Sequence, residues 1–151
     1  MDERVIYISY FYKIRFFEKN MIPFSTATFN PKWYREHGCF LDKNGVVNGL
    51  RILDLIPNSS CQEHGVVCNT VECKHDANCE FLRRYYEQLK NIDFNSLIAK
   101  LYKFVDELSM HLNIDNPKIV LIVYEPPYKT CSERIMLIKW FKENGYELRE
   151  F

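Results

Sequence analysis

The 151-residue chain has no excess charge of either sign, because 20 lysines and arginines balance 20 aspartates and glutamates. Proteins that bind the phosphate backbone of nucleic acids usually carry a net positive charge. Bulk nucleic-acid binding is therefore disfavoured, whereas a local basic patch stays compatible with the composition. Glycine is also scarce, at 5 residues, and no glycine-rich phosphate loop or dinucleotide-binding fingerprint occurs.

Long apolar runs are absent as well. The opening stretch MDERVIYISY has two acidic residues where a secretory signal has basic ones, and its apolar run is too short for a membrane span. We therefore expect a cytoplasmic protein without a membrane partner, located in the host cytoplasm if a phage encodes it. No repeat or Ser/Gly-rich linker interrupts residues 1–151, which predicts a single domain. None of these features indicates an oligomeric state.

The chain has what a folded core requires, since 47% of its residues are hydrophobic and 15% are aromatic. Residue patterns predict strands over 5–10, 21–28, 119–125 and 146–151, with a hairpin around Asn44-Gly45. Helical spacing of apolar residues predicts helices over 79–91, 93–113 and 130–145. This order predicts an α/β fold, a three-layer domain with a mostly parallel Rossmann-like sheet and a cysteine-rich, metal-binding insertion.

The insertion spans about residues 58–80 and holds four of the six cysteines, namely Cys61, Cys68, Cys73 and Cys79. In a reducing cytoplasm, clustered thiols are more often metal ligands than disulfides. The segment has few residues able to build a core, so a bound metal would supply the missing cohesion. We expect these four thiolates to bind a structural zinc ion, with an iron–sulfur cluster as the alternative cofactor.

Other interpretations of the insertion stay open, because its spacing lacks the CxxC pairs of a zinc ribbon. The thiols could form disulfides, or some could pack in the core as small hydrophobic groups. A site of three cysteines and one histidine would use His64 or His75 and leave one thiol over.

Three stretches, IYISYF, IPFSTATFNPKWY and VLIVYEPPYKTCSERIMLIKWFKENGYEL, together resemble domain-of-unknown-function family 488, found in bacteria, archaea and phages. Tyr124, Glu125, Cys131 and Arg134 match the family pattern of a strand end followed by a cysteine, a basic residue and an amphipathic helix. Members often carry histidine directly after the cysteine, whereas this chain has Ser132. The resemblance implies the fold and no particular activity.

In doubly wound sheets, ligands bind outside the carboxyl ends of the strands. The residues that we expect at such a site are Ser9, Tyr10, Ser25, Thr26, Trp33, Glu125, Cys131 and Arg134. Arg134 is suited to hold a carboxylate or phosphate, or else it pairs with Glu125 or Glu133. Trp33 is suited to stack on a planar ring, or else it belongs to the core.

Two of these residues are also candidate catalytic groups. Glu125, at the end of a strand, is suited to act as a general base or to bind a sugar hydroxyl. Cys131 is expected at the start of the last helix, where free amides and the helix dipole favour a thiolate or a bound anion. The alternative for Cys131 is a cysteine without a chemical role, and both interpretations stay open.

These features favour a metal-stabilised domain that binds a small anionic ligand, such as a nucleotide or a nucleotide-derived signal. Such a domain would sequester or sense its ligand. One alternative is an enzyme that acts on a nucleoside or nucleotide with Glu125 and Cys131 as the reactive groups. Another is an adaptor whose cysteine-rich lobe binds a second protein.

Overall fold

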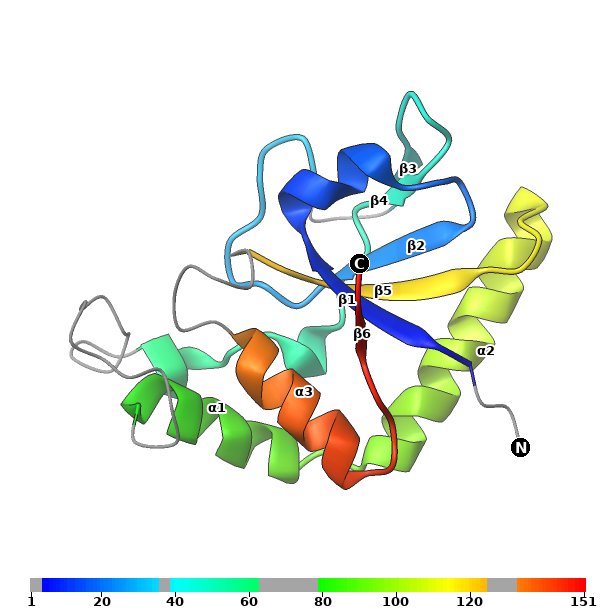
Figure 1. Cartoon of the computed structure of the whole chain (residues 1–151). Coiled ribbons are helices and arrows are strands. Elements are labelled where there is room, and N and C mark those ends of the chain that lie inside the picture. The colour runs from blue at the N-terminus through cyan, green and yellow to red at the C-terminus, as the bar shows by residue number, and fades with distance from the viewer. Residues whose placement is uncertain (1–3, 36–38, 63–78, 125–132) are drawn as a thin grey trace.

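A computed structural model of the chain describes residues 4–35, 39–62, 79–124 and 133–151 (Figure 1). Its central sheet has the strand order β2-β5-β1-β6. The strands are β1 (Ile6–Tyr10), β2 (Met21–Ser25), β5 (Lys118–Val123) and β6 (Arg149–Glu150). Every pair of neighbouring strands in this sheet is parallel. The prediction of an α/β fold with a mostly parallel sheet is therefore confirmed.

The two faces of the sheet are covered by different elements, because successive side chains of a strand point to opposite faces. Ile8, Phe24 and Leu121 share one core cluster with α1 (Glu80–Lys90), α2 (Phe94–Leu112) and α3 (Glu133–Glu143). Val120 and Ile122 belong to a second cluster with the 3-10 helix η1 (Phe11–Phe16). Figure 1 shows α1 and α3 below the sheet, α2 rising beside it, and η1 above it.

The connections between strands follow from the strand order. The chain from β1 through η1 to β2 passes β5, whereas the chain from β5 through α3 to β6 passes β1 in the opposite direction. Crossovers of one hand must then lie on opposite faces of the sheet. A Rossmann-like three-layer arrangement stays a prediction, because α1, α2 and α3 share one face and the shorter η1 covers the other.

The first two α-helices lie where the periodicity of apolar residues predicts them. The buried face of α1 consists of Phe81, Leu82, Tyr85 and Leu89. The break before α2 ends at Asp93, whose side chain accepts a hydrogen bond from the Ser96 amide at 3.2 Å. This contact satisfies one of the free amides at a helix start.

The predicted hairpin is also confirmed. Strands β3 (Phe40–Leu41) and β4 (Val47–Asn48) pair in antiparallel fashion. Gly45 in the turn has a φ of 79°, a conformation that suits glycine. The Asp42 carboxylate accepts hydrogen bonds from the Asn44 and Val46 amides at 2.8 and 3.0 Å, which closes the loop. Two short 3-10 helices follow, η2 (Leu53–Leu55) and η3 (Ser59–Gln62).

Some boundaries differ from the sequence prediction. Strand β2 ends at Ser25 rather than at residue 28, although the next amide, that of Thr26, still donates to the Ile122 carbonyl of β5 at 2.8 Å. Gly145 follows α3 with a φ of 86°, as a helix terminator should. The expected start of that helix at residue 130 lies outside the described residues. In the described parts of the chain, no helix combines the length and hydropathy that a membrane span requires.

Candidate functional site

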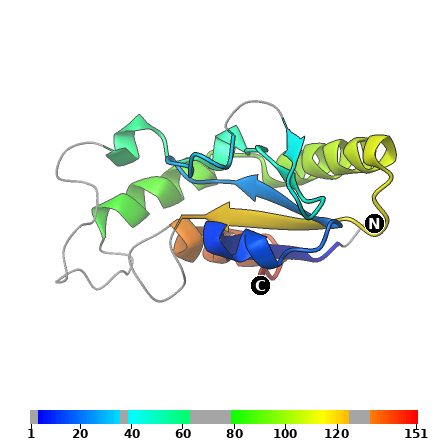
Figure 2. The same ribbon diagram turned by 90° about the horizontal axis from the view of Figure 1, so that it is seen from above.

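The carboxyl ends of β1 and β5 mark the point where the fold changes direction. These two strands are neighbours, yet the chain leaves β1 toward η1 on one face and leaves β5 toward α3 on the other. In parallel sheets, ligands bind at such a switch point. Figure 2 shows the arrowheads of β2 and β5 pointing toward the same side of the molecule. The structure therefore has a switch point between β1 and β5, and a ligand site there stays a prediction.

Four aromatic residues gather at this switch point. Because Tyr10 is in register with Val123, the next residues along each strand, Phe11 and Tyr124, come side by side. Phe11 is buried and makes edge-on ring contacts with Trp33, Tyr34 and Tyr124 at centroid distances of 6.1, 5.2 and 6.1 Å. We call Phe11, Trp33, Tyr34 and Tyr124 the strand-end aromatic cluster.

Two members of the cluster face solvent. Trp33 is 49% exposed and Tyr124 is 54% exposed, although both rest against the buried ring of Phe11. Large aromatic side chains that remain half open at a strand end are suited to stack on a planar ligand. Of the residues expected at the ligand site, Trp33 is thus the one most open to solvent among those that the structure describes, and Tyr10, at the end of β1, is half-buried.

Tyr34 anchors the turn that carries Trp33. Its amide donates to the Pro31 carbonyl at 2.9 Å, and its hydroxyl donates to the Leu50 carbonyl. Burial raises the pKa of the Tyr34 hydroxyl well above its usual value, so this group remains a donor at any physiological pH. The buried side chain of Tyr34 therefore fixes the backbone next to Trp33.

The hydroxyl groups expected at the site are engaged inside the protein. Ser9 and Ser25 are both in register with Ile122, one on each side of β5, which separates them by about 10 Å or two strand spacings. Both are fully buried. Ser9 Oγ donates to the Phe151 carbonyl at 3.4 Å, and Ser25 Oγ donates to the Asn30 side chain.

Thr26 has a similar structural contact. Its hydroxyl and its amide both donate to the Ile122 carbonyl, at 2.9 and 2.8 Å. The hydroxyl groups of Ser9, Ser25 and Thr26 thus all donate hydrogen bonds within the protein at the ends of the strands. Their proposed contact with a ligand stays a prediction.

A second group of aromatic residues lies on η1, and the sequence analysis did not single it out. Tyr12 and Phe16 are 54% and 59% exposed, and the Tyr12 ring stacks on Tyr10 at 6.5 Å. The guanidinium of Arg15 lies 3.9 Å from the centre of the Tyr12 ring, and Arg15 Nε donates to the Tyr12 carbonyl at 3.0 Å. The aromatic run YFYKIRFF directly after the first strand was the signal for this surface.

The structure gives Arg134 a partner that the sequence analysis did not suggest. It lies in the first turn of α3, is buried, and forms an ion pair with Glu150 of β6. A buried cation needs such a partner, because the loss of hydration is otherwise uncompensated. Its guanidinium therefore ties α3 to the last strand. The candidates Glu125 and Cys131 lie outside the described residues.

Two of the four predicted metal ligands lie in the core. Cys61 and Cys79 are buried within the cluster that α1 and α3 share. Cys61 Sγ lies 3.6 Å from Asn58 Oδ1 and 3.8 Å from Gln88 Oε1, and burial raises the pKa of this thiol. As long as no metal is bound, these features favour a protonated thiol that donates a hydrogen bond.

The other two predicted ligands, Cys68 and Cys73, lie outside the described residues. Among residues 4–35, 39–62, 79–124 and 133–151, no three histidine, cysteine, aspartate or glutamate side chains come together as a metal site. The zinc or iron–sulfur site thus stays a prediction.

The chain matches no protein-family model, no curated protein and no solved structure. Membership of domain-of-unknown-function family 488 also stays a prediction. The candidate site is accordingly defined by its own geometry.

Proposed function

We propose that this protein is a small cytoplasmic binding module that holds a small anionic ligand with a planar ring at the carboxyl ends of β1 and β5. A nucleotide or a nucleotide-derived signal has this chemistry. The module acts by sequestering or sensing its ligand, and it requires no acid–base pair. This location is the one that a Rossmann-like fold uses for its ligands.

The observation that carries the proposal is the pair of half-exposed rings, Trp33 and Tyr124, which both contact buried Phe11 at the switch point. A nucleobase has a flat apolar face and polar edges, and it stacks on such rings whatever its hydrogen-bonding pattern. Stacking of this kind typically contributes about 1–3 kcal/mol per base. The strand-end aromatic cluster therefore suits the planar part of a nucleotide.

Two basic groups are suited to the anionic part of the ligand. Arg15 lies against the exposed Tyr12 ring on η1, the same 3-10 helix that begins with Phe11. Arg134 lies in the first turn of α3, where the helix dipole also favours an anion. Because Glu150 already pairs with Arg134, a ligand phosphate there has to share that guanidinium. Arg15 is accordingly our first choice for the phosphate contact.

The proposal keeps the cysteine-rich insertion as a metal-stabilised lobe beside this domain, with zinc or an iron–sulfur cluster bound by Cys61, Cys68, Cys73 and Cys79. Its role in the proposal is structural, since four thiolates leave no open position for a substrate.

Isothermal titration calorimetry against a panel of nucleotides, including cyclic and ADP-ribose-derived ones, tests the proposal. We expect Trp33→Ala to weaken binding by about tenfold or more, the equivalent of one lost stacking contact. Tyr124→Ala should act in the same direction. Met110→Ala is a matched control, because Met110 is 80% exposed on α2 and contributes nothing to the strand ends.

The outcomes separate the proposal from its alternatives. If no nucleotide binds wild-type protein at micromolar concentration, the binding module is wrong and an adaptor function takes its place. If a bound nucleotide is converted, and Glu125→Gln or Cys131→Ser abolishes turnover while affinity is kept, the protein is an enzyme. Binding that Trp33→Ala and Tyr124→Ala leave unchanged would place the ligand elsewhere.

A further inference from the structure

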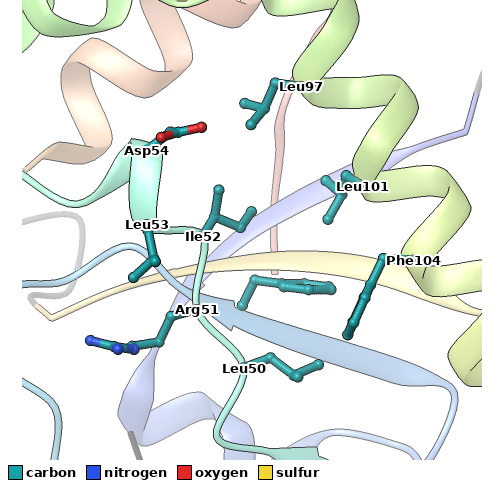
Figure 3. A pocket seen from close by; sticks show the side chains of 9 residues that line it. Leu50, Arg51, Ile52, Leu53, Asp54, Leu97, Leu101 and Phe104 are labelled. Atoms are coloured by element: carbon teal, nitrogen blue, oxygen red, sulfur yellow. The ribbon is translucent and has the colours of Figure 1, made fainter. Parts of the chain in front are cut away.

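A surface groove lies on the helical side of the sheet, beside the edge strand β2 (Figure 3). Its volume is about 350 Å³, and its apolar walls come from Phe24, Leu50, Ile52, Leu97, Leu101 and Phe104. Figure 3 shows the α2 side chains of Leu97, Leu101 and Phe104 on one side and the 50–54 segment on the other. Phe104 is 43% exposed, although its ring contacts Phe24 at 6.0 Å. The groove is therefore an open apolar surface rather than a closed part of the core.

The rim of the groove carries a projecting side chain. Leu53, at the start of η2, is 67% exposed and lies between Arg51 and Asp54 along the chain. An apolar side chain this exposed is costly in water unless another surface covers it. A projection and a hollow that lie side by side on one surface can fill each other in two copies related by a two-fold axis.

The charges of the rim suit the same arrangement. Arg51 and Asp54 flank Leu53, and Figure 3 shows their charged groups directed away from one another. On α2, Lys100 and Glu107 are exposed one turn before and one turn after Phe104. A two-fold axis that passes between Arg51 and Asp54 sets Arg51 of each copy opposite Asp54 of the other copy. The chain as a whole is neutral, which removes long-range repulsion between copies.

We propose that this groove is the interface of a two-fold symmetric homodimer. Leu53 of each copy inserts between the 50–54 segment and α2 of the other copy, and Arg51 pairs with Asp54 of the partner subunit. The occupant is a second copy of this chain rather than an unrelated protein, because shape and charge are both self-complementary. No residue of the strand-end aromatic cluster lines this groove, although Tyr34 donates to the Leu50 carbonyl behind it. The inference does not require the proposed ligand.

Sedimentation velocity across a concentration series tests the dimer. We expect wild-type protein to shift from monomer to dimer as its concentration rises. Leu53→Asp should weaken the dimer by about tenfold or more, because it removes the inserted side chain and adds a charge to the apolar groove. Leu53 is exposed, so the variant should fold. Met110→Asp changes an exposed apolar residue elsewhere on α2 and should leave the dimer intact.

A charge exchange tests the pairing across the axis. Arg51→Glu alone and Asp54→Arg alone each place like charges together twice, and each should weaken self-association. An equimolar mixture of the two variants restores both pairs, so it should form a heterodimer. Only a direct contact between copies predicts this recovery. Circular dichroism of each variant establishes that it folds, and Leu53→Asp serves as the test should Arg51→Glu not fold.

Three results would overturn the proposal. The first is wild-type protein that stays monomeric at hundreds of micromolar. The second is a dimer that Leu53→Asp leaves unchanged, which would place the interface elsewhere. The third is a mixture of folded charge variants that remains monomeric. An apolar dye that binds the groove of a purely monomeric wild type would make the groove a small-molecule pocket instead.

Discussion

Polar side chains near the strand ends mostly have partners within the protein. Ser9 and Ser25 donate hydrogen bonds to Phe151 and Asn30, and Arg134 is paired with Glu150. By contrast, the faces of Trp33 and Tyr124 are half open. Recognition at this site is therefore expected to depend more on stacking than on hydrogen bonds from these hydroxyls. A ligand with a planar ring fits that expectation better than a sugar alone.

At the residue scale, Glu80 should make stability depend on pH in the acid range. It is the first residue of α1, and its contacts with Arg83 and Arg84 lower the pKa of its carboxyl from 4.5 to about 2. A carboxyl with a lowered folded-state pKa stabilises the protein above its unfolded pKa, and this contribution is lost as pH falls toward the folded value. We expect Glu80→Gln to destabilise the protein at neutral pH.

Urea unfolding at a series of pH values measures this effect. The difference in midpoint between wild type and Glu80→Gln should shrink as pH falls from about 5 toward 2. High salt should also reduce it, because the pairs are exposed. Glu107→Gln, at an exposed position on α2, is the control and should show no comparable trend. A difference that is constant with pH would mean that Glu80 acts through something other than its charge.

At the scale of single elements, α2 combines local signals with tertiary contacts. Its buried stripe includes Ile98, Leu101 and Val105, which pack in the core cluster beneath the sheet. Its first turn is capped by Asp93, and it ends at Asn113 in the left-handed conformation with a φ of 55°. Both ends are thus defined by residues that satisfy the free backbone groups of a helix.

We predict that Asp93→Ala destabilises the protein by about 1 kcal/mol, because the Ser96 amide loses its acceptor. Asp93→Asn is the matched control, since its amide oxygen can still accept that hydrogen bond, and it should cost less. The two midpoints of urea unfolding give the comparison. Equal losses in both variants would show that the charge of Asp93, and not its capping oxygen, stabilises α2.

The edge strand β2 contains a proline and is partly covered by another segment. Pro23 cannot donate a hydrogen bond, and it lies in β2, which is the edge strand next to β5. The segment after the hairpin partly covers this edge, because the Ser25 amide donates to the Leu50 carbonyl and the Ile52 amide donates to the Ser25 carbonyl. The same segment then forms one wall of the proposed dimer interface.

At the scale of the whole molecule, metal binding should stabilise the cysteine-rich insertion. We predict about one zinc ion or one iron–sulfur cluster per chain, measured by elemental analysis and native mass spectrometry. Cys68→Ser should lose the metal, whereas Cys39→Ser and Cys131→Ser should keep it. Cys39 is exposed and remote from the insertion in sequence. Metal-free protein with all four insertion thiols open to titration would contradict the prediction.

Cys61 gives a second readout for the same prediction. Its side chain is buried and burial raises the pKa of its thiol, so Cys61→Ala tests whether this side chain packs in the core or binds metal. A loss of stability without a loss of metal would mean that Cys61 belongs to the core. The metal would then be held by other ligands of the insertion.

The positions of most elements could be predicted from the sequence, because their signals are local. Apolar residues at helical spacing defined α1 and α2, and the Asn44-Gly45 turn defined the hairpin. Arg134 was harder. Its partner, Glu150, lies on a strand that reaches it only because β6 pairs with β1, and no local pattern encodes that pairing.

By itself, the sequence determined the α/β class and the order of the α-helices and main strands, and it singled out Trp33 as a candidate ligand contact. Such features depend on the spacing of neighbouring residues. The tertiary structure decided the strand order, the burial of Ser9 and Ser25, and the contact of Phe11 with both exposed rings. These depend on contacts between segments far apart in the chain, where packing selects one arrangement and short-range patterns carry no information.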